Sequence, residues 1–370
     1  MKVFAVSHSM VVPANRIFFE ELGKKIQLKA IVPKNWIQKD LSQKPKNFQL
    51  IEGTVLFQPH IFRYFFIPGK IFEVLKFRPD IVYIEEEPQS ISAFQAVLWA
   101  KFSGSKVVLK SCENMKRNLR FPFNIIEKFV LSQTNLLICL TKGVEEVFIE
   151  KGFGGKVSVV GLGVERFKLD DKSRETVRKK HSISKFAIGY FGRMVSEKSI
   201  ETIIEAAASL DFDYQIVLDM HEDSTASFVD KPYKEKLMEL ARKRGIENRI
   251  TFVSPSYEEI GNYLSAIDVL VLPSKTTKGW KEQFGRVLIE AMNVGTPVIG
   301  SSSGSIPEII GNAGLIFNEG NPIELSGKIK EIYKNKKIAD GLRKKGFERA
   351  LEFSLDKIAG KTIAAFENAK

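Results

Sequence analysis

The feature that most constrains the fold of this chain is a repeated alternation of short apolar runs with helical patterns. In the N-terminal half the apolar runs lie at residues 2–7, 28–32, 80–84, 106–109, 136–140 and 157–160. Helical patterns lie between them, at residues 16–25, 90–102 and 142–151 among others. Short β-rich runs that alternate with helices predict a parallel sheet made of βαβ units.

A second series of the same kind follows the charged stretch 170–180, which we interpret as a linker with some helix. Its apolar runs lie at residues 186–191, 214–218, 250–252, 269–272, 297–300 and 314–317. Since 370 residues exceed what one hydrophobic core usually serves, we expect two α/β domains. They cover residues 1–172 and 180–353. A last helix within residues 354–370 can join either domain.

The composition limits the cellular setting more than the chemistry. Net charge is +12, and residues 1–170 carry 25 Lys and Arg against 16 Asp and Glu. A basic half can attract anionic lipid, nucleic acid or phosphorylated substrates, and ordinary solubility explains it equally well. The two cysteines form no disulfide framework, and no apolar stretch is long enough to span a membrane. We expect a cytoplasmic protein that is soluble or peripheral on the membrane's inner face.

The first chemical motif is GRMVSEKS, residues 192–199, which follows an apolar run and precedes an amphipathic helix. A strand–loop–helix junction gathers backbone N–H groups that suit an anion. Arg193 offers a planar fork to a phosphate, and Lys198 offers a mobile point charge. Two cations near such a junction fit a pyrophosphate, whereas the alternative is a surface loop with two ordinary cations.

The second motif is EQFGRVLIEAMNVGTPVIGSSSGSIPE, residues 282–308. We expect Gly285 to open a helix, so that Glu282 lies in the preceding loop and Glu290 on the helix. Ionised carboxylates only accept hydrogen bonds, so Glu282 can bind sugar hydroxyls and Glu290 the hydroxyls of a ribose. The small residues after 300 can let a backbone approach a ligand. The alternative is a helix with one exposed and one lysine-paired acid.

These two motifs, together with VLPS at residues 271–274, resemble the C-terminal domain of retaining glycosyltransferases of family 4, which have the GT-B fold. The resemblance covers about residues 136–350. It implies two Rossmann-like domains with parallel sheets that face an interdomain cleft, with the donor in the C-terminal domain and the acceptor in the N-terminal one. It also implies a retaining hexosyltransferase that needs no metal or other cofactor.

The resemblance assigns roles to the donor residues. The positions of Arg193 and Lys198, after Gly192, would hold the pyrophosphate of a UDP- or GDP-sugar and stabilise the departing diphosphate. Glu282 would contact the donor sugar and Glu290 the ribose. The chain between the two glutamates would assist with its backbone, at Phe284, Gly285, Arg286 and Val287.

The N-terminal half departs from the family pattern. Many members have a glycine-rich loop after the first strand, where this chain has HSMVVPANR, and Asn15 or Arg16 is a candidate substitute. Many also have a histidine after a middle strand, where this chain has Glu113 and Asn114 in the stretch VVLKSCENM. The acceptor half is therefore the less specific part of the prediction.

Further candidates for the acceptor side lie at two predicted strand ends. The run Glu85–Glu87 is followed by Pro88, so these acids cannot form one solvated helix face, and Glu86 or Glu87 can meet an acceptor hydroxyl. The alternative is a charged loop. His8 follows the first strand and can line the cleft. His221 is a weaker candidate, since a surface residue explains it as well.

Two segments, residues 60–78 and 115–129, combine basic and aromatic side chains. If they are exposed, they can dock on an anionic membrane, and if they are buried, they are core helices with cationic rims.

The expected function is glycosyl transfer in the synthesis of cell-surface polysaccharide, lipopolysaccharide or glycolipid, with a glycan or lipid-linked acceptor and no nucleic acid partner. Two alternatives stay open, a nucleotide-sugar epimerase of the same fold and a non-catalytic basic binding protein.

Overall fold

A computed structural model describes residues 1–36, 44–169, 172–220 and 231–370 of the chain. The chain divides into two compact units. Unit 1 consists of Met1–Gly163 together with Leu355–Lys370, and unit 2 consists of Val164–Ser354. Residues 164–172 thus belong with the second unit, and the last helix with the first. Each unit is described by itself below.

Unit 1 is built on a seven-stranded sheet in the order β3-β2-β1-β6-β7-β8-β9, with every neighbouring pair parallel. The strands are β1 (Lys2–Val6), β2 (Gln27–Pro33), β3 (Gln49–Gly53), β6 (Ile81–Ile84), β7 (Lys106–Ser111), β8 (Leu136–Cys139) and β9 (Lys156–Val159). A short antiparallel pair, β4 (Val55–Leu56) and β5 (Phe65–Phe66), lies between β3 and β6 in the chain. β6 is buried along its whole length, as expected of a parallel strand covered on both faces.

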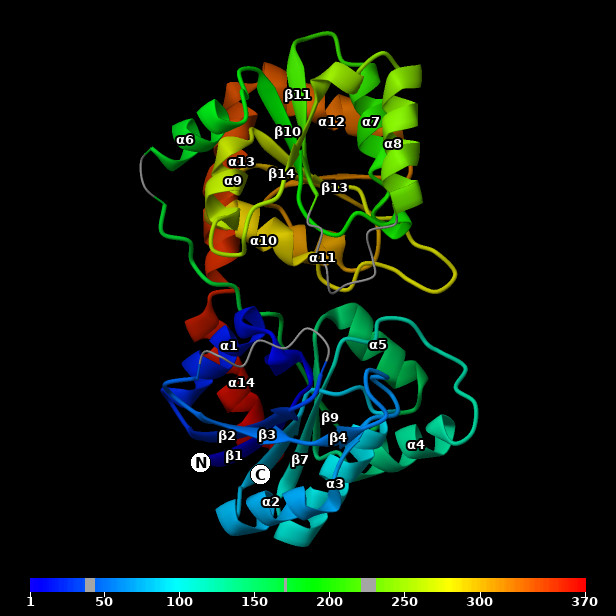
Figure 1. Ribbon diagram of the computed structural model, residues 1–370, viewed down its shortest axis with the longest axis vertical. Coiled ribbons are helices and arrows are strands. Elements are labelled where there is room, and N and C mark those ends of the chain that lie inside the picture. The colour runs from blue at the N-terminus through cyan, green and yellow to red at the C-terminus, as the bar shows by residue number, and fades with distance from the viewer. Residues whose placement is uncertain (37–43, 170–171, 221–230) are drawn as a thin grey trace. The chain divides into compact units, whose positions relative to one another are not determined.

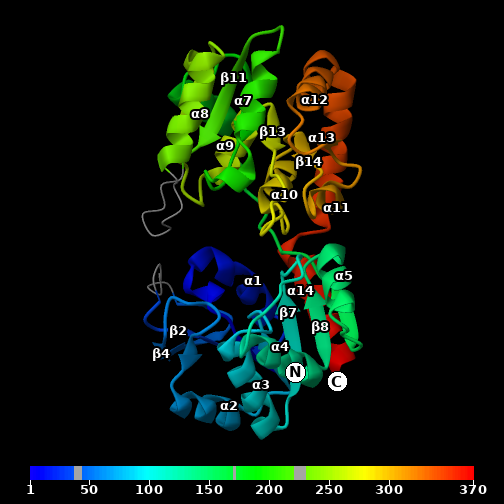
Figure 2. The ribbon, with the colours of Figure 1, turned by 90° about the vertical axis from the view of Figure 1, so that its right-hand side faces the viewer.

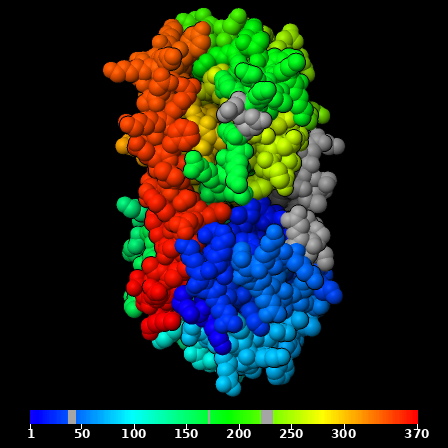
Figure 3. Space-filling view, turned by 90° about the vertical axis from the view of Figure 1, so that its left-hand side faces the viewer, coloured from blue at the N-terminus to red at the C-terminus, as the bar shows by residue number. Residues whose placement is uncertain are grey.

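The helices of unit 1 flank this sheet (Figure 1). They are α1 (Pro13–Gly23), α2 (Ile71–Phe77), α3 (Ile91–Ser103), α4 (Phe123–Gln133), α5 (Lys142–Glu150) and α14 (Leu355–Ala369). α1 begins at Pro13, three residues before the expected start, because proline at the first helical position has no N–H to leave unsatisfied. α14 packs on α1, β7 and β8, and Figures 2 and 3 show these last residues, in red, against unit 1.

Unit 2 is built on a six-stranded parallel sheet in the order β12-β11-β10-β13-β14-β15. Its strands are β10 (Phe186–Tyr190), β11 (Tyr214–Asp219), β12 (Ile250–Val253), β13 (Val269–Leu272), β14 (Val298–Ser301) and β15 (Leu315–Phe317). Its helices are α6 (Ser173–Lys180), α7 (Glu201–Ala208), α8 (Lys231–Lys243), α9 (Ile260–Ala266), α10 (Arg286–Asn293), α11 (Ile306–Ile310), α12 (Pro322–Lys334) and α13 (Lys336–Leu351). The prediction of two α/β units with parallel sheets is confirmed.

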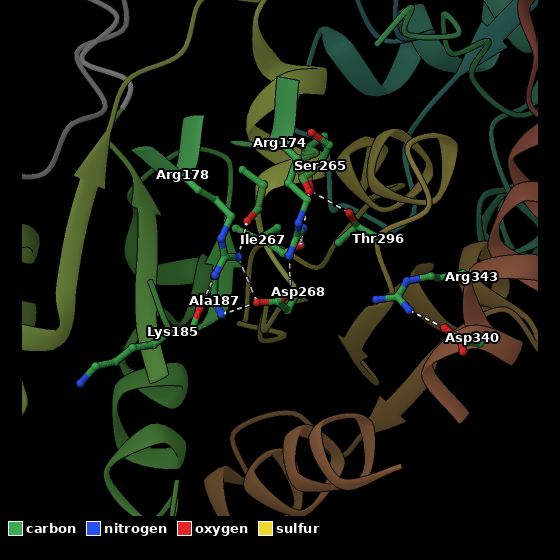
Figure 4. Close-up of polar contacts among 12 residues, drawn as sticks. Arg174, Arg178, Lys185, Ala187, Ser265, Ile267, Asp268, Thr296, Asp340 and Arg343 are labelled. Carbon is green, nitrogen blue, oxygen red and sulfur yellow. Dashed lines mark hydrogen bonds and ion pairs between the residues drawn. The ribbon is translucent and has the colours of Figure 1, made fainter. Parts of the chain in front are cut away.

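The charged stretch expected to be a linker contains α6, which is fixed to the sheet of unit 2 by arginine side chains (Figure 4). Arg174 and Arg178 both bind the carboxylate of Asp268, at 2.5 and 3.2 Å. Arg174 also donates to the carbonyl of Ser265 at 2.5 Å, and Arg178 to that of Ala266 at 2.9 Å. These carbonyls belong to the last turn of α9, where the helix itself supplies no donors.

Candidate functional site

In unit 2, the order in which the chain adds strands to the sheet reverses between β10 and β13. The chain continues from β10 to β11 and β12 on one side, and from β13 to β14 and β15 on the other. Loops that leave the carboxyl ends of two such strands diverge, and ligands of open α/β sheets bind there. The loop after β10 carries Gly192 and Arg193, and the loop after β13 carries Glu282. Both sequence motifs therefore start from one switch point.

The structure brings Lys198 and Glu282 into direct contact. The Lys198 Nζ lies 2.5 Å from the Glu282 Oε2, and the Ser274 hydroxyl donates to the same oxygen at 2.7 Å. Glu282 is only 6% exposed, and the ammonium group lies 5.0 Å from the centre of the Trp280 ring. A lysine held in this way can exchange a carboxylate for a phosphate oxygen, because both make charge-assisted hydrogen bonds with it.

The loop that carries Glu282 is held by the turn after β14. A Cβ on Gly304 would lie 2.1 Å from the Glu282 carbonyl oxygen, and the Ser305 N–H donates to that oxygen at 3.0 Å. The Ser301 hydroxyl donates to the carbonyl of Ser274 at 2.5 Å. The small residues here let the turn approach the protein's own backbone at Glu282, and they help to fix the position of this residue. The expectation that they also let the backbone approach a ligand stays a prediction.

Helix α10 begins at Arg286, and Gly285 precedes it with a φ of +74°. Gly285, which occupies the N-cap position, has no side chain that could accept a hydrogen bond from the helix start. The first N–H groups of α10, at Arg286 and Val287, therefore have no partner within the helix and present a positive dipole end. The side chain of Phe284 is buried, and the centre of its ring lies 5.5 Å from that of Phe353.

Glu290 lies on α10 and is paired with Arg286, whose Nε is 2.9 Å from Oε1. Burial raises the pKa of Glu290, and the neighbouring guanidinium partly offsets this. Arg286 in turn lies over the ring of Tyr257, 5.3 Å from its centre. A ribose at Glu290 would therefore meet a carboxylate that already holds a cation.

The turn after β10 is fixed by two hydrogen bonds. The Gly192 N–H donates to the Asp219 carboxylate at 3.3 Å, and the Tyr190 hydroxyl donates to the carbonyl of Arg193 at 2.6 Å. Gly192 has a φ of +142°, which favours glycine. The side chain of Arg193 is exposed at this turn. His221 lies outside the described residues.

Unit 1 has its own switch point, between β1 and β6, and a second charged cluster lies there. Glu86, which is 3% exposed, follows β6 and accepts hydrogen bonds from the backbone N–H of His8 at 2.6 Å and the Tyr64 hydroxyl at 2.6 Å. Nδ1 of the His8 ring lies 2.8 Å from the Glu86 Oε2. Burial lowers the pKa of His8, but the charge and hydrogen bond of Glu86, together with the charges of Glu85 and Glu87, raise it by more, so that the net shift is upward.

The two neighbouring acids are each bound to a different partner. Glu85 accepts from Lys110 at 2.8 Å and from the Tyr83 hydroxyl at 2.8 Å. Glu87 accepts from the Ser111 hydroxyl at 2.5 Å and from the backbone N–H of Cys112 at 3.0 Å. Burial raises the pKa of Glu87 to about 7. The alternative interpretation of Glu85–Glu87, a solvated charged loop, does not agree with these contacts.

The remaining N-terminal candidates are built into unit 1. Lys151 bridges Glu113 and Glu127, with 2.6 Å to each carboxylate. The Asn15 amide donates to the carbonyl of Ser9 at 2.9 Å and so holds the turn after β1. Arg16 and Asn114 are both 4% exposed.

The cysteines behave as small buried groups. Cys139 is buried and Cys112 is partly buried, and burial raises the pKa of each thiol to about 12. Thiols of this kind are poor nucleophiles.

Within the described ranges, no three histidine, cysteine, aspartate or glutamate side chains are grouped to hold a metal ion. No helix there is long and apolar enough to cross a membrane.

Sequence reasoning missed several residues of these clusters. Trp36, Tyr64, Ser274 and Trp280 all contact candidate residues, yet none of them was named as a candidate. Ser274 closes the VLPS stretch and lies two residues after β13, and both its motif and its place at a strand end could have identified it.

Comparison with known proteins agrees with this geometry. Residues 173–349, slightly less than half of the chain, match the family model described as glycosyl transferases group 1. An uncharacterised glycosyltransferase of Methanocaldococcus jannaschii is 24% identical over 233 residues, which cover 62% of this chain and 58% of that protein. A D-inositol 3-phosphate glycosyltransferase of Streptomyces bingchenggensis is 28% identical over 219 residues, 56% of this chain and 46% of the relative. The match thus spans about half the length of these relatives.

The whole chain resembles a solved structure. The Anabaena protein HepE, in complex with UDP, superposes with a TM-score of 0.79 at 16% identity and covers 99% of this chain and 100% of that one. At this identity the likeness shows the fold, which is the GT-B arrangement of two Rossmann-like domains.

Proposed function

We propose that this protein is a retaining, metal-independent glycosyltransferase that moves a hexose-type sugar from a nucleoside-diphosphate sugar to an acceptor hydroxyl. The observation that carries the proposal is the Lys198–Glu282 pair at the β10/β13 switch point, in the loop that leads into α10. The match of this same region to glycosyl transferases group 1 supports it.

In the proposed reaction, the bond between the anomeric carbon and the diphosphate oxygen breaks while the acceptor oxygen bonds to that carbon. Arg193 and Lys198 bind the diphosphate, with Gly192 and the N–H groups of α10 beside them, and stabilise the charge that it gains. The acceptor oxygen attacks from the face that the diphosphate leaves, so the configuration is retained without an enzymic nucleophile. The acceptor proton passes to the released diphosphate, so no enzymic base is required. Glu282 binds the donor sugar through its hydroxyls.

The nucleotide base and the ribose occupy the part of the site near Glu290. We propose a UDP-sugar as the donor, because the fold is that of HepE, which has been solved with UDP and with UDP-glucose. The ribose hydroxyls would donate to Oε2 of Glu290, because Oε1 is the oxygen that is paired with Arg286. The acceptor side belongs to unit 1, with His8, Asn15, Arg16, Glu86, Glu87, Glu113 and Asn114 as its candidates.

The proposal is tested by incubating the protein with UDP-, GDP- and ADP-sugars, with and without polyol acceptors, and measuring nucleoside diphosphate release. Glu282→Ala should lower kcat/KM by about 100-fold or more, as the loss of a group that positions the transferred sugar does. Glu239→Ala, which removes an exposed carboxylate on α8, should leave it unchanged. The transferase proposal fails if no sugar nucleotide is bound or turned over. Conversion of the sugar nucleotide to an epimer would establish the epimerase instead.

We propose in addition that unit 1 contacts an anionic membrane surface from the cytoplasmic side. Large apolar side chains are exposed in the two basic-aromatic segments, with Phe72 69%, Phe121 77% and Ile125 56% exposed. Arg120 and Lys128 are exposed beside the last two in the chain. The protein should sediment with phosphatidylglycerol vesicles and less with phosphatidylcholine vesicles, and salt should weaken this binding. Equal binding to both lipids would exclude a charge-driven contact.

A further inference from the structure

His8 and Glu86 form a dyad at the switch point of unit 1. His8 follows β1 and Glu86 follows β6, which are neighbours in the sheet, and the chain leaves them toward opposite sides. Side chains at such a point face the crevice where ligands of α/β sheets bind. The dyad therefore occupies the position in unit 1 that Gly192 and Ser274 occupy in unit 2.

The geometry fixes the imidazole of His8 in one orientation. The buried Glu86 carboxylate only accepts hydrogen bonds when ionised, so Nδ1 of His8 carries the proton that points at it. The backbone N–H of His8 and the Tyr64 hydroxyl, both 2.6 Å from Oε1, hold the carboxylate in place. The other ring nitrogen, Nε2, is thereby directed away from Glu86 on a side chain that is 28% exposed. In the neutral ring it is a hydrogen-bond acceptor.

An aromatic ring lies beside the dyad. The centre of the Trp36 ring is 5.5 Å from that of His8 and 5.0 Å from that of Tyr64, and Trp36 is partly exposed. An indole face carries negative charge density that attracts C–H groups, and a pyranose or cyclitol ring presents such groups on one face and hydroxyls at its edge. An aromatic face beside a fixed hydrogen-bonding nitrogen is complementary to a polyol ring.

We propose that His8 and Trp36 form the subsite that binds the acceptor's ring, with the ring packed on Trp36 and a ring hydroxyl hydrogen-bonded to Nε2 of His8. The acceptor class is then a sugar or cyclitol. This proposal rests on the proposed function and specifies its acceptor side. Glu86 and Tyr64 act through His8 as positioning residues.

The test uses the full chain labelled with 5-fluorotryptophan, which gives three ¹⁹F signals because the protein has three tryptophans. Trp280 lies at the donor site, Trp36 at the proposed subsite and Trp99 is buried in unit 1. Tryptophan-to-phenylalanine variants assign the signals. UDP should move the Trp280 signal. With UDP present, methyl glucoside, methyl mannoside, methyl galactoside and myo-inositol are then titrated, and at least one should move the Trp36 signal saturably.

His8→Ala should weaken that binding by about tenfold or more, as the loss of one well-made hydrogen bond does. His60→Ala, the same change at an exposed residue of unit 1, should not. An unchanged Trp99 signal checks that His8→Ala is folded. Trp36→Ala gives a second variant, whose loss of acceptor binding is measured through the acceptor KM because the variant has no Trp36 signal. In kinetics, both variants should raise the acceptor KM, whereas His60→Ala should leave the acceptor KM unchanged.

Two results would overturn the subsite, and they differ. If UDP moves Trp280 but none of the four polyols moves Trp36, the subsite is wrong and the transferase proposal survives. If the polyols move Trp36 equally in the wild type and in His8→Ala, the histidine has no role in binding. If neither UDP nor UDP-glucose moves Trp280 and no turnover occurs, the proposed function fails, and the subsite loses its premise.

Discussion

At the scale of single residues, Glu87 is a buried carboxylic acid whose pKa lies well above its usual range. Burial raises its pKa from 4.5 to about 7, although the Ser111 hydroxyl and the Cys112 N–H both donate to it. The folded-state pKa thus lies above the unfolded one. Stability from this shift is fully present below about pH 4.5, and it is lost as the pH rises through about 7.

Glu87→Gln should therefore become stabilising relative to the wild type as the pH rises. The amide keeps an acceptor for Cys112 and carries no charge, so the variant escapes the cost of ionising a buried acid. The difference in free energy of unfolding should grow by about 2–3 kcal/mol between about pH 4.5 and pH 8. Urea unfolding at a series of pH values measures it. A difference that stays constant across this range would contradict the raised pKa.

The Lys198–Glu282 pair should show strong coupling. Lys198→Met leaves a buried carboxylate without its cation and should cost about 3 kcal/mol or more of stability, whereas adding Glu282→Gln should recover part of that loss. A double-mutant cycle by urea unfolding gives the coupling. Both single variants should also lose at least about 100-fold in kcat/KM. Additive stability losses would show that the two side chains are not paired in the free protein.

The residues of the two proposed sites differ in how well the sequence alone predicts them. Arg193, Lys198, Glu282 and Glu290 could be proposed because each lies in a contiguous motif with strand and helix signals around it. The dyad of His8 with Glu86 could be named only as separate candidates, since its members are 78 residues apart. Trp36 carries no local signal, and Tyr64 lies in a segment that was considered only for membrane contact, so the fold alone brings them to the dyad.

At the scale of elements, the contacts between α6 and the sheet of unit 2 decide stability without touching the proposed site. Asp268 precedes β13 and also accepts from the backbone N–H of Ala187, which is in β10, at 2.8 Å. It therefore lies near the amino ends of both strands, whereas the candidate donor residues follow their carboxyl ends. Sequence reasoning interpreted residues 170–180 as a linker with some helix, and the helix is α6; the strong charge of this stretch gave no sign that its arginines bind the sheet.

Asp268→Asn should lower the stability of the protein by about 1–3 kcal/mol, because two guanidinium groups lose their anion. The activity per folded molecule should stay unchanged. Asp340→Asn is the matched control, since Asp340 pairs with Arg343 at 2.6 Å on the exposed surface of α13 (Figure 4). Its effect should stay within about 0.5 kcal/mol. If the two variants are equally stable in thermal and urea unfolding, the cluster does not hold α6.

At the scale of the whole molecule, the last helix joins the first unit. The apolar face of α14 shows in the sequence that the helix is buried, but not which sheet covers it, so the pattern alone left its unit open. In the structure the ring of Phe366 lies 5.1 Å from that of Tyr83 in β6. Lys25 of unit 1 lies 2.6 Å from Asp356, and Lys156 donates to the carbonyl of Asn368 at 2.7 Å. Unit 1 is therefore assembled from both ends of the chain.

Phe366→Ala should destabilise unit 1 selectively. The ring is fully buried, and removal of such a side chain leaves a cavity that costs about 3–5 kcal/mol. Hydrogen exchange followed by mass spectrometry should show faster exchange in β1, β6, β7 and β8, while β10–β15 keep their protection. Phe102→Ala, the same change at a residue of unit 1 that is 70% exposed, should alter neither set. If β10–β15 lose protection to the same extent, the two units unfold together, and the last helix stabilises the whole chain through a single cooperative transition.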